Sequence, residues 1–282
     1  MCIRDSFHIV DDVEKLSDFD LDAVYVTTPI SSHFPVIKKI YENGIAKSVF
    51  VEKPLASNFR EATELYRLAH NSGKIDMVGY MRRFSVPFRK AKDLLEQGVV
   101  GWPLSFSVYA YSSDFFGMDK NKRVRTPKVG VLRDLGCHAI DLALWFFGDL
   151  EVENAEVGSV IGSCTEDFAN FEVKTLDRVR GVFDVSWCVD GHRMPEVGFV
   201  IEGSKGNLSV NDDKLELSLN DGSMHRWFRH DLGDRVDFWL GSPEYYREDE
   251  RFVKAIVCGE DVEPSFETAA KVDGLIDEVL NR

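Results

Sequence analysis

Asp134, His138 and Asp141 are the residues of this sequence whose types and spacing best suit acid–base chemistry. Residues four and three positions apart lie on one face of a helix, so their side chains should point the same way. Nearly all their neighbours up to Phe147 are apolar, which predicts a buried helix ending at Gly148. Burying two carboxylates and an imidazole is costly unless they are partnered, and such clusters concentrate at functional sites.

A purely structural interpretation of this helix stays open. In it, Asp134 is the N-cap and His138 is a hydrogen-bonded core residue. We favour the functional interpretation, in which His138 takes the proton of a substrate hydroxyl, because an imidazole titrates near neutrality. Asp134 then fixes the tautomer of the ring.

Lys53 is the second candidate, within the tripeptide Glu52-Lys53-Pro54 that follows the apolar run 48–51. That run predicts a buried parallel strand, and ligands of open α/β sheets bind beyond the carboxyl ends of such strands. Lys53 can there donate a hydrogen bond to an alcohol oxygen and stabilise its developing negative charge. Oxidising an alcohol also needs a hydride acceptor, which a nicotinamide supplies. The alternative is a solvated corner between strand and loop.

The first third of the chain alternates strand and helix signals. We expect strands at 22–28, 48–51 and 75–80, and helices at 31–43 and 58–71, the second with Asn58 as N-cap and Gly73 as its stop. Strands separated by helices predict a parallel sheet with right-handed crossovers. This part, 1–80, is expected to be an incomplete dinucleotide-binding domain.

The pattern changes after a helix expected at 86–97. Short alternating segments then dominate, which predicts an α+β domain with a large, mostly antiparallel open sheet over 81–282, serving substrate binding and oligomerisation. The expected strands are 104–112, 155–161, 168–174, 179–187, 197–202, 208–210, 215–219 and 224–228, and closing helices are expected at 245–257 and 268–280.

Five stretches, in order, resemble the Gfo/Idh/MocA oxidoreductase family and together cover nearly the whole chain. They are 22–29 with His33, 51–55, 79–84, 134–141 and 203–206. Each is weak alone, but the ordered set is specific. The resemblance implies a Rossmann-type domain that binds NAD or NADP. It also implies oxidation of a secondary alcohol, or reduction of the ketone, in a sugar, cyclic polyol or nucleotide sugar.

The resemblance also implies roles for individual residues. Lys53 matches the catalytic lysine of the family, and Glu52 matches the residue beside the nicotinamide ribose. The cofactor-binding set it implies is Thr28, Pro29, His33, Glu52, Lys53 and Arg82. The substrate-binding set is Tyr80, Asp134 and His138. For Arg82, a surface charge near a domain junction is the alternative.

One departure from the family is the lack of any G-x-G triplet, so the phosphate-binding turn of a Rossmann domain is absent. We expect the natural protein to begin about 60 residues earlier, with two further strand–helix units of roughly 30 residues each. Residues 1–6 fit no structural pattern and are expected to be an artefact. The 282-residue polypeptide alone should then bind cofactor poorly and expose a sheet edge. NAD and NADP are not distinguished.

Composition excludes several function classes. The 282 residues carry 34 Lys and Arg against 48 Asp and Glu, a net charge of −14 that disfavours nucleic-acid binding. No apolar run is long enough to span a membrane, and no signal peptide is evident. The five cysteines include no C-x-x-C pair, which favours a reducing cytoplasm and gives no thiolate zinc site. We expect no metal.

Two further groups of residues are weaker candidates for a functional site. His225, His230 and Asp231 fit a solvated hairpin better than a metal site. The basic stretch 120–128 is a solvated loop or a contact for an anionic substrate. The open sheet face predicts a homodimer or homotetramer. Two rival functions on the same scaffold are a non-catalytic sensor of sugar or nucleotide, and a redox-neutral, NAD-dependent glycosidase.

Overall fold

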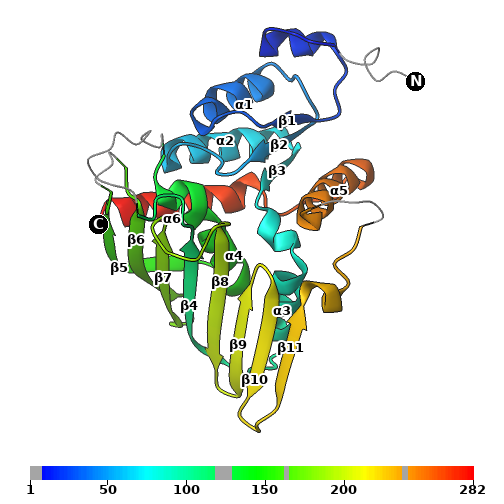
Figure 1. Cartoon of the computed structure of the whole chain (residues 1–282). Helices are drawn as coiled ribbons and strands as arrows, with labels where there is room; N and C mark the ends of the chain where they lie inside the picture. The colour runs from blue at the N-terminus through cyan, green and yellow to red at the C-terminus, as the bar shows by residue number, and fades with distance from the viewer. Residues whose placement is uncertain (1–7, 118–128, 162–164, 237–240) are drawn as a thin grey trace. The chain divides into compact units, whose positions relative to one another are not determined.

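A computed structural model describes residues 8–117, 129–161, 165–236 and 241–282 (Figure 1). The chain divides into two compact units. Unit 1 comprises Met1–Gly79 and Arg251–Ala270, and unit 2 comprises Tyr80–Glu250 and Lys271–Arg282. Unit 1 therefore includes residues 251–270, which come from far along the chain. The predicted first domain, 1–80, does not contain this segment.

Unit 1 is built on a three-stranded parallel sheet in the order β1-β2-β3, which confirms the predicted parallel arrangement. Its strands are β1 (Val24–Val26), β2 (Ser48–Glu52) and β3 (Ile75–Gly79), and its connecting helices are α1 (His33–Glu42) and α2 (Phe59–Ser72). The first four residues of β2 are all buried, as expected for a central strand covered on both faces. A 3-10 helix at Val13–Asp18 precedes the sheet and was not predicted.

The ends of α2 follow local signals in the sequence. The Asn58 side chain accepts a hydrogen bond from the Glu61 amide at 2.9 Å, which satisfies one of the N–H groups that lack an intrahelical acceptor. Gly73 ends the helix with a φ of 62°, a left-handed conformation that favours glycine. Both predicted boundaries are confirmed.

Asp76 on β3 holds the segment 251–270 within unit 1. Its carboxylate accepts a hydrogen bond of 2.5 Å from the amide of Phe266, the first residue of α6 (Phe266–Leu280). The backbone adds a second tie, from the Val78 amide to the Pro264 carbonyl at 2.9 Å. Burial raises the pKa of Asp76 to about 6; the Phe266 amide opposes this rise, while the nearby Glu263 and Glu267 add to it.

We expect Asp76→Asn to gain stability relative to the wild type as pH rises from about 4 to about 7. The pKa of Asp76 in the folded protein, about 6, lies above its ordinary value of 3.8, so protonation stabilises the folded state. That stabilisation is complete below about pH 3.8 and is lost as pH rises through about 6, whereas asparagine does not ionise. Urea unfolding should show a relative gain on the order of 1 to 3 kcal/mol. Asp18→Asn, at an exposed position of the same unit, is the control; identical pH dependence in Asp76→Asn and wild type would refute the assignment.

Unit 2 is built on a sheet that has eight strands within the described residues, in the order β11-β10-β9-β8-β4-β7-β6-β5. The strands are β4 (Pro103–Tyr111), β5 (Leu150–Gly158), β6 (Phe168–Thr175), β7 (Arg180–Ser186), β8 (Glu196–Gly203), β9 (Gly206–Asn211), β10 (Lys214–Leu219) and β11 (Met224–Phe228). Only the β4–β7 pair is parallel among them. The predicted mostly antiparallel sheet is confirmed.

One face of this sheet packs against α3 (Val86–Glu96) and α4 (Cys137–Phe147), which lie on the same side of it (Figure 1). Aromatic rings form the junction. Phe106 of β4 stacks on Phe147 of α4 with ring centroids 4.2 Å apart. A Cβ at Gly181 would lie 2.1 Å from the Phe106 ring, so the neighbouring strand needs glycine to admit it. The sheet thus packs closely against α4, the helix that carries His138.

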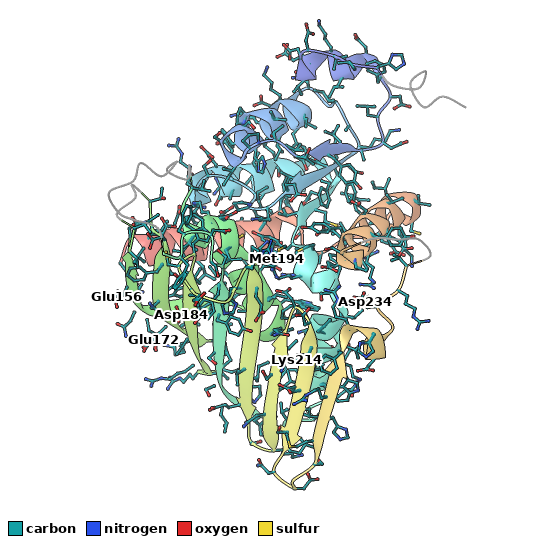
Figure 2. All side chains as sticks on the ribbon, in the orientation of Figure 1. Glu156, Glu172, Asp184, Met194, Lys214 and Asp234 are labelled. Atoms are coloured by element: carbon teal, nitrogen blue, oxygen red, sulfur yellow. The ribbon has the colours of Figure 1, made fainter. Side chains whose placement is uncertain are left out.

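The other face of the sheet carries mainly polar side chains. Figure 2 labels three of its acids, Glu156, Glu172 and Asp184, on β5, β6 and β7. Glu156 and Asp184 both lie opposite Asn170 in the ladder and so share its face. Two further helices, α5 (Pro243–Cys258) and α6, close the chain. In the described part of the chain, no helix has both the length and the apolar character that a membrane span requires.

Candidate active site

The carboxyl ends of β1 and β2 are joined by His33, a buried residue at the start of α1. Its Nε2 lies 2.7 Å from the Thr28 carbonyl oxygen, and its Nδ1 lies 3.0 Å from the Pro54 carbonyl oxygen. One imidazole therefore ties the loop after β1 to the loop that follows Lys53. Three of the predicted cofactor-binding positions, Thr28, Pro29 and His33, thus lie in one connected corner with the Lys53 loop.

Glu52 ends β2 and pairs in register with Gly79, the last residue of β3. A Cβ added at Gly79 would lie 3.3 Å from Oε2 of Glu52. The carboxylate of Glu52 therefore lies close to the backbone of Gly79, which has no side chain. A carboxylate at this point accepts hydrogen bonds only, which suits the hydroxyl groups of a ribose. The nicotinamide-ribose half of a dinucleotide site therefore fits the residues present.

His138 lies in α4 and is 6% exposed, as the buried-helix prediction requires. Asp134 is exposed, whereas the helix that carries it was expected to be buried. The alternative interpretation, in which Asp134 is an N-cap, is wrong, since the residue lies inside a π-helical turn, Leu132–Gly136, that runs directly into α4. Such turns are frequent at functional sites. A role of Asp134 at the substrate stays a prediction.

Asp141 is 1% exposed and is neutralised by Arg83, a residue that sequence reasoning missed. The guanidinium donates two hydrogen bonds to the carboxylate, Nη2 to Oδ1 at 2.7 Å and Nε to Oδ2 at 2.9 Å. It also lies 5.8 Å from the centroid of the Trp145 ring. This pair of hydrogen bonds ties α4 to the residue that follows Arg82 and gives the buried carboxylate a counter-charge.

Arg82 is held by different partners. Its guanidinium donates to both oxygens of Asp212, at 3.0 and 3.2 Å, and to the Pro195 carbonyl at 3.1 Å. Arg82 is 5% exposed, so the surface-charge alternative does not describe it. Burial raises the pKa of Asp212, and the guanidinium opposes that rise. These contacts hold the turn after Tyr80 to the sheet of unit 2; a cofactor contact by Arg82 stays a prediction.

Tyr80 meets His138 directly. The two rings lie edge to face, with centroids 6.1 Å apart and an interplanar angle of 83°. Tyr80 is completely buried, and burial raises the pKa of its hydroxyl, which therefore stays protonated. Within unit 2 the structure thus brings together two predicted substrate residues. Tyr80 supports the His138 ring in the structure, and a contact between Tyr80 and substrate stays a prediction.

The weaker candidates do not join these groups. His230 lies 3.3 Å from its neighbour Asp231 on an exposed 3-10 turn, and His225 stacks on Trp227. Among the described residues, no group of three or more His, Cys, Asp or Glu side chains is arranged to hold a metal ion. Of the basic stretch 120–128, all nine positions lie outside the described residues.

Family models match both parts of the chain. A model described as "Oxidoreductase family, NAD-binding Rossmann fold" matches residues 2–80, and the "GFO/IDH/MocA C-terminal domain" matches residues 88–209. The first match places residues 2–80 in a family of oxidoreductases with an NAD-binding Rossmann fold. Both together show that the chain belongs to the GFO/IDH/MocA family, which confirms the resemblance found in the sequence.

Individual relatives are similar at lower identity. Scyllo-inositol 2-dehydrogenase (NAD(+)) of Bacillus subtilis is 32% identical over 54% of this chain and 41% of its own length. Inositol 2-dehydrogenase of Rhizobium meliloti is 24% identical over 91% of this chain and 76% of its own length. An uncharacterised oxidoreductase of Schizosaccharomyces pombe, C26H5.09c, is 28% identical over 74% of the chain, which spans 58% of that relative. The chain thus spans roughly three-fifths or less of several relatives that it matches.

Solved structures confirm the fold. Levoglucosan dehydrogenase in complex with NADH and L-sorbose superposes with a TM-score of 0.85 at 23% identity, covering 96% of this chain and 80% of that structure. An oxidoreductase domain protein from Kribbella flavida gives a TM-score of 0.84 at 24% identity, with the same coverage. At this identity the likeness shows the architecture alone.

We expect Asp141→Asn to destabilise the protein by about 3 to 5 kcal/mol, because it leaves the buried Arg83 guanidinium without its counter-charge. Asp149→Asn is the matched control; it breaks the exposed pair with Lys271, at 2.9 Å, and should cost less than about 1 kcal/mol. Urea unfolding of both variants measures the difference. Equal losses in the two variants would show that the buried pair does not hold α4.

Proposed function

We propose that the full-length protein is an NAD- or NADP-dependent dehydrogenase that oxidises a secondary alcohol of a sugar, cyclic polyol or nucleotide sugar, or reduces the ketone. The observation that carries the proposal is the position of Lys53, directly after the carboxyl end of β2 and beside the His33–Pro54 contact. Ligands of parallel sheets bind at that edge. Membership of an oxidoreductase family and inositol dehydrogenases among the relatives support it.

A bound nicotinamide cofactor would supply the acceptor for the hydride of the alcohol carbon. Glu52 would hold its ribose hydroxyls, and the loop with Thr28, Pro29 and His33 would flank the nicotinamide. Arg82 also belongs to this proposed set, and its guanidinium is hydrogen-bonded to Asp212. The sequence contains no G-x-G triplet, so no pyrophosphate contact is assigned to this chain.

In the proposed reaction Lys53 and His138 act on the same hydroxyl group in different roles. The Lys53 ammonium donates a hydrogen bond to the alcohol oxygen and stabilises the negative charge that develops as the proton leaves. His138 accepts that proton as the general base. The edge of the Tyr80 ring fixes the plane of the imidazole. Asp134, exposed in the π turn before α4, orients the imidazole or binds a substrate hydroxyl.

We also propose that the protein acts as a homodimer or homotetramer through the open face of its eight-stranded sheet. Val182 and Val200 lie opposite Ser107 from its two sides on this face, and they are 48% and 37% exposed. Apolar side chains in the middle of a polar sheet face favour covering by a second copy. The cysteine pattern favours a reducing cytoplasm as its compartment.

Lys53→Met in the full-length protein should lower kcat for alcohol oxidation by at least about 100-fold, because the charge on the alcohol oxygen loses its stabilising donor. Cofactor affinity should change by less than about 3-fold, since the proposed ribose contact is Glu52. Production of reduced cofactor by absorbance and cofactor binding by fluorescence titration are the measurements. Lys38→Met, on the surface of α1, serves as control. A near-normal rate in Lys53→Met would refute the role.

His138→Asn should abolish the increase of kcat/KM with pH that a general base produces, since the rate then no longer follows deprotonation of an imidazole. The pH profile of the wild type and the variant checks this. An unchanged profile would remove His138 from the mechanism. Cofactor binding without turnover in the wild type would favour the sensor, and turnover without net reduced cofactor would favour the redox-neutral glycosidase.

A further inference from the structure

Glu166, in the connection between β5 and β6, caps the segment that carries Asp134 and His138. Its backbone carbonyl accepts a hydrogen bond from the Val131 amide at 3.0 Å, and its Oε1 accepts one from the Leu132 amide at 3.3 Å. Amides at the start of a helical segment have no intrahelical acceptor. Glu166 supplies acceptors for two of them from a distant part of the chain.

Gly130 makes room for this carboxylate. A Cβ built on Gly130 would lie 1.8 Å from Cδ of Glu166 and 1.9 Å from each carboxylate oxygen. No side chain fits there while Glu166 keeps its place. Gly130 is itself tied to the candidate site, because its carbonyl accepts a hydrogen bond from the Asp134 amide at 3.1 Å. The carboxylate thus contacts the residue from which the turn bearing Asp134 starts.

Asp167 fixes the position of Glu166 relative to the sheet. Its carboxylate, which is completely buried, accepts hydrogen bonds from the Ser159 hydroxyl at 2.6 Å, the Val160 amide at 2.7 Å and the Ile161 amide at 3.0 Å. Its backbone carbonyl accepts one from the Trp187 amide, just after β7, at 3.0 Å. A residue held by these four hydrogen bonds does not move easily, so its neighbour Glu166 is presented from a rigid support.

Burial and the helical segment act on the charged carboxylate of Glu166 in opposite directions. A carboxylate near the first amides of a helical segment interacts favourably with the positive end of the helix dipole. Burial raises the pKa of Glu166, whereas the Leu132 amide and the Arg133 guanidinium oppose that rise. Among the contacts of Glu166 with the turn, the amides of Val131 and Leu132 are the hydrogen-bond donors.

We propose that Glu166 is a positioning residue: its carboxylate, seated against Gly130, sets the place of the π turn that carries Asp134 and leads into His138. The proposal rests on the function proposed above, because that function makes the position of the π turn matter for catalysis. The contacts of Glu166 themselves do not depend on it. Glu166 acts through Leu132 and Gly130 and does not touch the reacting atoms.

The first test compares Glu166→Ala with Glu166→Gln in the full-length protein. Alanine removes the acceptor of the Leu132 amide, so hydrogen exchange at Leu132 should accelerate about five-fold, and the NMR signals of the His138 ring should shift. Glutamine keeps a side-chain oxygen and should restore both. Glu96→Ala, at an exposed position at the end of α3, is the matched control and should leave both unchanged. Wild-type behaviour of Glu166→Ala would overturn the proposal.

The second test uses Gly130→Ala in two backgrounds. With Glu166 present, the new methyl group must displace the carboxylate and should reproduce the Glu166→Ala effects. In the Glu166→Ala background the same substitution meets no carboxylate and should add nothing. A merely structural loss at two independent places would instead be additive, and additive effects would overturn the proposal. Gly130→Ala alone keeps the test decisive if Glu166→Ala does not fold.

The activity measurement separates this proposal from the proposed function. In the full-length enzyme Glu166→Ala should lower kcat about ten-fold and leave KM for the cofactor unchanged, with rescue by glutamine. If exchange and ring signals respond as expected while Lys53→Met and His138→Asn turn over normally, the proposed function fails and the positioning contact stands. If those two variants lose turnover but Glu166→Ala is fully active, the positioning proposal is overturned.

Discussion

The buried ion pair between Arg83 and Asp141 is the interaction on which the position of His138 depends. The helix α4 is apolar on almost every side, and a carboxylate in it must have a counter-charge to be tolerated. The bidentate contact joins α4 to the short turn Met81–Phe84, and this turn directly follows Tyr80. The Tyr80 ring therefore meets His138 edge to face, and the imidazole is held between a fixed helix and a fixed ring.

The residues proposed for catalysis come from both units of the chain, and each unit positions its own residues through contacts within that unit. In unit 1 a parallel sheet ends in Glu52 and is followed by Lys53, where His33 joins two loops. In unit 2 an antiparallel sheet supports the helix of His138. Both units belong to the architecture of the family, because the nucleotide-binding and C-terminal models match consecutive segments of this chain.

The sequence predicted the features that depend on local periodicity and on helix caps. It did not predict the contacts between residues that lie far apart along the chain. The parallel sheet, Asn58 and Gly73 follow from signals within a few residues. Arg82 and Arg83 are equivalent as sequence, and only partners 130 and 58 residues away decide which one meets Asp212 and which meets Asp141. The π turn that exposes Asp134 has no local signature in the residues around it. The contact of Glu166, 34 residues from Leu132, belongs to no motif.

The measurement that tests the central claim most directly is the structure of the full-length protein with a nicotinamide cofactor and a polyol bound together. The account predicts that Nζ of Lys53 and one ring nitrogen of His138 both lie within about 3 Å of the same alcohol oxygen, with the carbon bearing it facing the nicotinamide. A polyol that contacts one of these side chains and leaves the other outside the cavity would contradict the dehydrogenase mechanism.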